Sequence, residues 1–212
     1  MIPTLTALHV KNLSLSRGGR RVIESLNCHV KSGEILHLRG KNGSGKTSLL
    51  RCIAGLLPAD SGVIEWQGMD SDSDELDRRR ILLWLGINNG LKAHETIDQH
   101  CNFIVRIAAA EASQEDLRQR ITAALHRMGL DRLADQPIQK LSTGQRQRLA
   151  LTALILRPAR LWLLDEPSLG LDDSGLSLLS DLLHDFCQSG GMVLMASHQD
   201  LPLTLPGRTL EL

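Results

Sequence analysis

The sequence contains no tyrosine and has only three tryptophans and two phenylalanines. So few rings argue against the base-stacking platform that single-strand nucleic-acid binders use. An excess of one charge is missing as well, because 24 Lys and Arg residues balance 24 Asp and Glu residues. A neutral chain has no bulk basicity to release counterions from nucleic acid. We therefore expect no nucleic-acid partner.

Cysteines and long apolar runs are also scarce. The four cysteines lie far apart, which indicates neither a disulfide framework nor a CxxC metal or redox motif. They are Cys28, Cys52, Cys101 and Cys187. The longest apolar stretch, Leu149 to Leu156, is far shorter than the roughly 20 residues that span a bilayer. The first ten residues have no basic n-region, so we expect neither a membrane span nor a signal peptide.

The 212 residues are 42% apolar, which fits a single domain with its own core. The first forty or so residues alternate apolar and polar side chains, as half-buried antiparallel strands do. After a glycine loop, helical spacing begins at Lys46 and ends before Pro58. Later strands alternate with helices, which predicts a mostly parallel sheet. We expect strands at 62–68, 81–86, 161–165 and 192–197, helices at 94–132, 143–156 and 173–188, and a charged, solvated loop at 69–80.

A phosphate-binding motif follows the third expected strand. Gly40–Thr47 reads GKNGSGKT and matches the pattern GxxxxGK[ST]. Its glycines let the backbone curl so that N–H groups and the helix N-terminus face phosphate oxygens, while Lys46 reaches the β and γ phosphates and Thr47 binds Mg²⁺. This motif alone does not separate a kinase, a GTPase and an ATPase. The residues expected to contact the nucleotide here are Gly40, Lys41, Asn42, Gly43, Ser44, Gly45, Lys46, Thr47 and Ser48.

Two carboxylates end a later apolar strand, in the segment LWLLDEP. Asp165 comes at the carboxyl end of the strand, where ligands bind in open α/β sheets, and is expected to hold Mg²⁺. Glu166 is then placed to orient or deprotonate an attacking water. Adjacent carboxylates at a strand end are often only a solvated turn, but a phosphate loop in the same chain favours the catalytic interpretation.

A third motif, LSTGQ at Leu141–Gln145, begins an expected helix about twenty residues before Asp165. Taken alone it is an N-capped helix start. In the order phosphate loop, LSTGQ, apolar-Asp-Glu and a lone histidine (His198), the chain resembles the ATP-binding-cassette (ABC) ATPases. The resemblance implies an α/β P-loop NTPase with an antiparallel β subdomain and a helical subdomain at about 92–142, all within one cassette covering 1–212.

The resemblance also implies a head-to-tail homodimer that sandwiches two ATP molecules with Mg²⁺. Ser142, Gly144 and Gln145 would then contact the nucleotide held by the opposite subunit. His198 would be the switch histidine at the γ-phosphate, and Ser168–Asp172 (SLGLD) resembles the loop that links the two sites.

Two positions depart from the family pattern. The aromatic residue that stacks on adenine would fall near Arg17, where no ring occurs, although an arginine plane can also stack on a base. Where the family places a glutamine that contacts Mg²⁺ and water, the chain reads INNG. Spacing favours Asn88 as its equivalent, with Asn89 the alternative, and Asn88 is then a further candidate Mg²⁺ and nucleotide contact.

Within this family, the strand LLWLG, the following NGLK and the closing SHQ resemble the haem-exporter ATP-binding subunits of bacterial cytochrome c maturation. That resemblance implies integral membrane partner subunits, an indirect link to a periplasmic haem chaperone, and a peripheral location on the cytoplasmic face of the inner membrane. The membrane subunits are expected to bind between the helical insertion and the core. Two alternatives stay open: a transporter subunit for another substrate, and a non-hydrolysing nucleotide-binding module.

Overall fold

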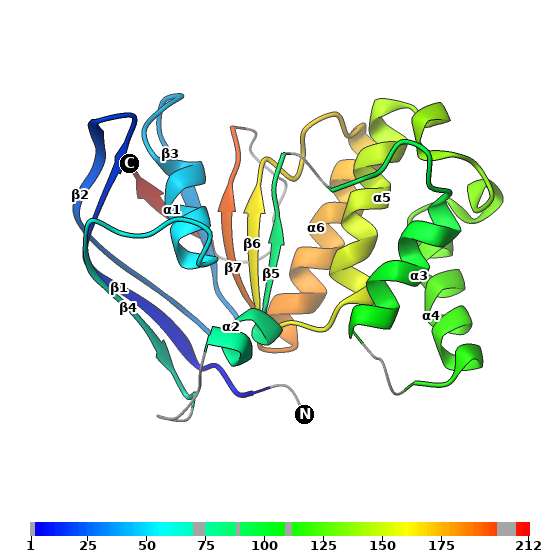
Figure 1. Ribbon diagram of the computed structural model, residues 1–212, viewed down its shortest axis with the longest axis horizontal. Coiled ribbons are helices and arrows are strands. Elements are labelled where there is room, and N and C mark those ends of the chain that lie inside the picture. Colours follow the sequence, from blue (N-terminus) through cyan, green and yellow to red (C-terminus); the bar gives the residue numbers. More distant parts are fainter. Residues whose placement is uncertain (1–2, 70–74, 88–89, 109–111, 199–206) are drawn as a thin grey trace.

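The computed structural model describes residues 3–69, 75–87, 90–108, 112–198 and 207–212. Within these ranges two β-sheets and the helices lie side by side along the long axis of the molecule (Figure 1). An antiparallel sheet lies at one end, a parallel sheet in the middle and most of the helices at the other end. The helix α1 lies between the two sheets.

The antiparallel sheet has three strands in the order β2-β1-β4. Its strands are β1 (Ala7–Arg17), β2 (Arg20–Lys31) and β4 (Ser61–Gln67). Inward-facing residues of β1, such as Leu8 and Val10, join Leu49 and Leu50 of α1 in one hydrophobic core. The alternation of apolar and polar residues thus selects which face of this sheet covers α1.

The parallel sheet has five strands in the order β5-β6-β7-β3-β8. They are β5 (Leu82–Leu85), β6 (Leu161–Asp165), β7 (Met192–Ala196), β3 (Ile35–Arg39) and β8 (Gly207–Glu211). Every residue of β6 and β7 is buried, because elements cover both faces of the sheet. Asp165 is the charged member of these central strands, and it ends β6 at the carboxyl edge.

Helices cover the two faces of the parallel sheet. One face packs on α1 (Lys46–Ile53), and the other packs on α5 (Thr143–Leu156) and α6 (Asp173–Gln188). Beyond α5 lie α3 (Ile97–Ala108) and α4 (Gln114–Arg127), followed by 3₁₀ turns at Asp131–Leu133 and Ile138–Lys140. Among the described residues, no helix is long and apolar enough to cross a membrane.

Most of the predicted elements are confirmed, and α5 and α6 begin and end at the expected residues. Two expectations are wrong, and one strand was missed. β3 pairs in parallel with β7 and β8 and does not continue the antiparallel sheet. The expected charged loop at 69–80 contains the helix α2 (Glu75–Ile81), within which Glu75 pairs with Arg79. The strand β8 was not expected, and it adds to the free edge of β3.

Candidate nucleotide site

The phosphate loop connects the carboxyl end of β3 to the first turn of α1. Gly45, just before α1, has φ 108°, a left-handed conformation that glycine adopts without steric cost. A Cβ there would lie 2.8 Å from Cγ1 of Ile23 on β2. Gly45 brings no side chain to cap α1, so the N–H groups of the first turn face outward for an anion.

Lys46 folds back over the loop that precedes it. Its Nζ donates to the carbonyl oxygen of Gly40 at 2.7 Å and to that of Lys41 at 3.1 Å. The residue is only 8% exposed. Both partners are neutral carbonyl groups, so these hydrogen bonds do not offset the positive charge that an anionic ligand would meet.

Ser44 gives an independent sign of a ligand in this loop. Its Oγ is buried and has no hydrogen-bond partner among the described residues. A buried hydroxyl group without a partner costs about 1–3 kcal/mol, and native structures rarely leave one. A phosphate oxygen in the loop would accept its hydrogen bond, so the loop fits a nucleotide phosphate.

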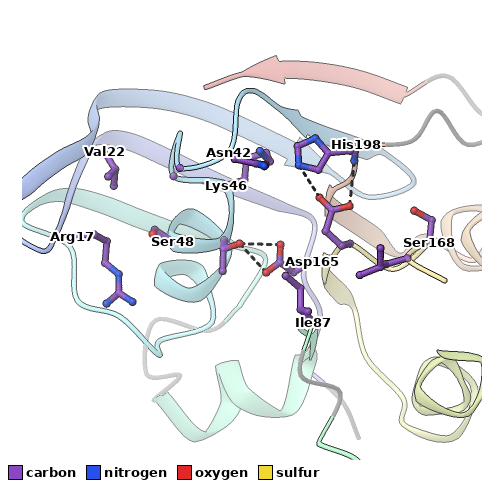
Figure 2. Close-up of a pocket in the computed structure, with 14 residues that line it drawn as sticks. Arg17, Val22, Asn42, Lys46, Ser48, Ile87, Asp165, Ser168 and His198 are labelled. Carbon is purple, nitrogen blue, oxygen red and sulfur yellow. Dashed lines mark hydrogen bonds and ion pairs between the residues drawn. The ribbon is translucent and has the colours of Figure 1, made fainter. Parts of the chain in front are cut away.

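Thr47 and Asp165 meet across 118 residues of sequence. Thr47 Oγ1 lies 3.0 Å and 2.9 Å from the two carboxylate oxygens of Asp165 (Figure 2). Asp165 is 3% exposed, and this burial raises the pKa of its carboxyl group, an effect that the Thr47 hydrogen bond partly opposes.

Hydroxyl and carboxylate oxygens are the ligands that Mg²⁺ prefers, so this pair fits such an ion. In the part of the chain that the structure describes, no three His, Cys, Asp or Glu side chains group to hold a metal ion. Water and phosphate oxygens, the usual partners of Mg²⁺, could supply further ligands.

Glu166 and His198 pair beside this site. Glu166 follows β6 and His198 follows β7, and the parallel register of the two strands brings their ends together. The backbone N–H of His198 donates to Glu166 Oε2 at 3.3 Å, and His198 Nε2 lies 3.5 Å from Glu166 Oε1 (Figure 2). The carboxylate is 16% exposed and the imidazole 51% exposed, so both reach the pocket.

These groups line one pocket of about 590 Å³, within the size range of small-ligand sites. Arg17 and Val22, from the β1–β2 hairpin, line its outer part on the far side of α1 (Figure 2). Ile87 lines it as well and is 56% exposed. The predicted contacts Asn88 and Asn89 lie outside the described residues.

The LSTGQ residues lie elsewhere and do not line this pocket. Ser142 caps α5 with a reciprocal pair: its Oγ accepts from the Gln145 N–H at 3.2 Å, and Gln145 Oε1 accepts from the Ser142 N–H at 2.9 Å. Ser142 is exposed and Gly144 partly exposed, so this helix N-terminus faces solvent. The predicted site residues thus form two groups, one around the phosphate loop and one at the start of α5.

The segment Ser168–Asp172 connects these two groups. A Cβ on Gly144 would lie 3.2 Å from the carbonyl oxygen of Gly170, so the start of α5 packs closely on this segment. Arg148 of α5 donates to Asp172 Oδ1 at 2.6 Å, and this bond lowers the pKa of Asp172 to about 2.

Sequence reasoning missed several residues here. Val22 and Ile87 line the pocket, and no local pattern distinguishes them from other apolar residues. Leu169 also lines it and lies within the segment Ser168–Asp172 that the sequence had singled out. Gln147, buried on α5, donates from Nε2 to the carbonyl oxygen of Pro167 at 2.8 Å. A polar residue at a core-facing position of α5 was the signal that could have identified it.

Residues 23–169 match the ABC transporter family. A protein named cytochrome c biogenesis ATP-binding export protein CcmA, from Albidiferax ferrireducens, is 36% identical over 99% of this chain and 98% of its own length. The protein of the same name from Vibrio cholerae is 39% identical over 92% of each chain.

Solved structures give the same fold. One described as an ATP-binding subunit of an ABC transporter has a TM-score of 0.77 at 27% identity, covering 92% of this chain and 80% of that one. The structure of cbiO1 from Clostridium perfringens, described as part of the ABC transporter complex cbiONQ, has a TM-score of 0.73 at 27% identity. It covers 94% of this chain and 81% of its own.

Proposed function

The chain belongs to the ABC transporter family and is an ATP-binding, ATP-hydrolysing subunit, and from this premise we propose that it powers haem export, or release of a haem chaperone, in cytochrome c biogenesis. The observation that carries the hydrolytic part is the convergence of Lys46, Thr47–Asp165 and Glu166–His198 on one pocket. The names of the relatives support the cytochrome c part.

The pocket residues divide the work of ATP hydrolysis among them. The loop N–H groups, Ser44 and Lys46 bind the phosphates, which positions the γ-phosphoryl group beside Glu166. Glu166 then orients the attacking water and accepts its proton. His198 holds the Glu166 carboxylate through its backbone N–H and its imidazole and contacts the γ-phosphate. Mg²⁺ held by Thr47 and Asp165 would supply positive charge to neutralise the phosphates. Arg17 stacks on the adenine, and Asn88 takes the place of the family glutamine.

The site is completed by a second copy of the chain. Ser142, Gly144 and Gln145 lie outside their own pocket, so each copy presents a solvent-facing, anion-attracting helix N-terminus to the nucleotide of its partner. The homodimer docks on integral membrane subunits at the cytoplasmic face of the inner membrane, in the cleft beside the helical subdomain at about 92–142. Closure of the dimer on ATP moves this subdomain and so acts on the membrane partners and, through them, on a periplasmic haem chaperone.

A Glu166→Gln variant tests the hydrolytic mechanism. We expect it to bind ATP with unchanged affinity, to hydrolyse it about 10²–10⁴-fold more slowly, and to accumulate as an ATP-bound dimer on size-exclusion chromatography. Glu115→Gln, on the exposed surface of α4, is the matched control. Near-normal turnover of Glu166→Gln in the assembled complex would contradict the role of Glu166.

The biological role is tested in cells. Replacing the chromosomal copy with Lys46→Ala removes the phosphate-binding ammonium group, so c-type cytochromes should disappear from a covalent-haem stain of membrane and periplasmic proteins. Normal cytochrome c levels alongside the loss of another transport activity would instead show that the chain serves a different substrate.

A further inference from the structure

The backbone of Glu166 is held in a conformation that it would not adopt by itself. Its φ is 53°, in the left-handed region that costs a non-glycine residue of order 1–3 kcal/mol. Glu166 also precedes Pro167, a position that sterically favours extended backbone. Such a conformation persists only where the surrounding structure imposes it.

Three hydrogen bonds impose it, two from the end of β7 and one from α5. The N–H of Glu166 donates to the carbonyl oxygen of Ala196 at 2.8 Å, which ties it to β7. Ser168 Oγ lies 3.2 Å from Ser197 Oγ, a buried hydrogen bond to the same strand end. From the opposite side, Gln147 Nε2 donates to the carbonyl oxygen of Pro167 at 2.8 Å.

The bond from Gln147 differs from the other two because it comes from α5. Gln147 is 8% exposed, and a buried hydrogen bond from its side-chain amide to a carbonyl group is costly to break. The same helix begins at Thr143. A Cβ added to Gly170 would lie 2.9 Å from Cγ2 of Thr143, so the two residues pack closely. The LSTGQ end of α5 and the segment after Glu166 are therefore packed against each other at two points.

We propose that Gln147 is a positioning residue for Glu166: it holds the Pro167 carbonyl group, and with it the left-handed backbone that directs the Glu166 carboxylate into the pocket. The bond also links Glu166 to the helix that reaches the partner's nucleotide. Seating of the partner's nucleotide on α5 thereby sets the position of Glu166 in the same chain. This inference rests on the proposed role of Glu166 as the base.

The first test is Gln147→Leu, which keeps the approximate volume and removes the donor. We expect the kcat for ATP to fall roughly 10–100-fold, because a shift of about 1 Å at a reacting group has an effect of that size. The KM for ATP stays within about twofold, because Lys46 and Thr47 are not touched. Thr152→Val is the matched control: Thr152 is fully buried on the same helix and donates to Leu149 within it, so its kcat stays near wild type.

A second variant, Gln147→Glu, should make kcat depend on pH in a way that would not arise if Gln147 were merely structural. Its carboxylate cannot donate to the Pro167 carbonyl group, but its protonated form can, and burial raises the pKa of such a carboxyl group. The ratio of its kcat to that of wild type should therefore rise as the pH falls from about 8.5 to about 6. Both proteins share every other ionisable group around the site, so the ratio to wild type at each pH isolates the effect of the substituted carboxyl group.

The outcomes separate this inference from the proposed function. A normal kcat in Gln147→Leu, or a pH-independent ratio in a folded Gln147→Glu, overturns the role of Gln147. If Gln147→Leu does not give a cooperative thermal melt, the Gln147→Glu ratio decides. Loss of turnover in Glu166→Gln together with normal Gln147 variants rejects this inference alone, whereas normal turnover in Glu166→Gln rejects the proposed mechanism itself. The assays use the assembled complex.

Discussion

Asp165 is a residue at which stability and function oppose each other. Burial raises the pKa of its carboxyl group, and the hydrogen bond from Thr47 and the charges of Arg51 and Lys46 reduce this effect. Because the folded-state pKa lies above the unfolded value, the folded chain binds this proton more tightly than the unfolded chain. The associated stability is present at pH values below the ordinary pKa of 3.8 and is lost as the pH rises through the folded-state pKa.

We therefore expect Asp165→Asn to stabilise the chain without nucleotide. The amide keeps the shape and still accepts from Thr47 but carries no charge, so Tm at pH 7 should rise by roughly 2–4 °C. The gain should shrink as the pH falls through the raised pKa of Asp165, because the wild-type carboxyl group then loses its charge as well. Differential scanning calorimetry across this pH range measures it, with Asp181→Asn on the exposed face of α6 as the control.

A lower Tm of Asp165→Asn at pH 7 would contradict the inference that burying the charge of Asp165 costs stability. Mg²⁺-dependent ATP hydrolysis should be lost in this variant, which follows from the proposed ligand role.

At the scale of elements, the unit β3–loop–α1 is the part that local sequence specified most completely. Glycines stand where the chain takes positive φ, and Lys46 and Thr47 begin the helix directly after Gly45. Two of these glycines differ in their surroundings. A Cβ on Gly45 would meet Ile23, whereas a Cβ on Gly43 has nothing within 4 Å.

This difference makes a prediction about alanine substitutions. Gly43→Ala costs only the left-handed backbone, roughly 1–2 kcal/mol of unfolding free energy. Gly45→Ala adds a steric overlap with Ile23, so we expect it to cost at least about 1 kcal/mol more. Urea denaturation of the nucleotide-free chain compares the two variants. Equal stabilities would mean that β2 moves away from the loop without cost.

Two other elements show where local patterns mislead. The run of charges at 69–80 reads as a solvated loop, but Glu75 and Arg79 lie one helical turn apart and form an ion pair on α2. β8 is short and largely exposed, so it has little periodicity for a sequence pattern to detect. Its strand conformation depends on the edge that β3 offers for pairing.

At the scale of the whole molecule, the separation of LSTGQ from the pocket predicts a site shared between two copies. Mixing a Lys46→Ala chain with a Gly144→Asp chain should give dimers with one intact composite site and one doubly damaged site. Each variant alone has two damaged sites, so ATPase activity should return on mixing, to at most about half of the wild-type rate per mixed dimer. Steady-state hydrolysis across mixing ratios measures this recovery.

A Lys46→Ala chain mixed with a Lys46→Ala, Gly144→Asp chain is the control, since no pairing of these chains forms an intact site. Hydrolysis by wild-type protein that remains monomeric at the assay concentration would contradict the shared site.

The sequence by itself determined most of the strands and helices, apart from α2, β8 and the pairing of β3, together with the phosphate loop, the Asp165–Glu166 pair and the family. Side-chain periodicity and the special conformations of glycine specify these features because they act over a few residues. Only the tertiary structure decided that Thr47 meets Asp165, that Glu166 pairs with His198 and takes φ 53°, and that Gln147 supports Pro167. These contacts join residues far apart in the chain, and they form because parallel strand ends meet at one edge of the sheet and α5 packs against it. Local sequence carries no record of that packing.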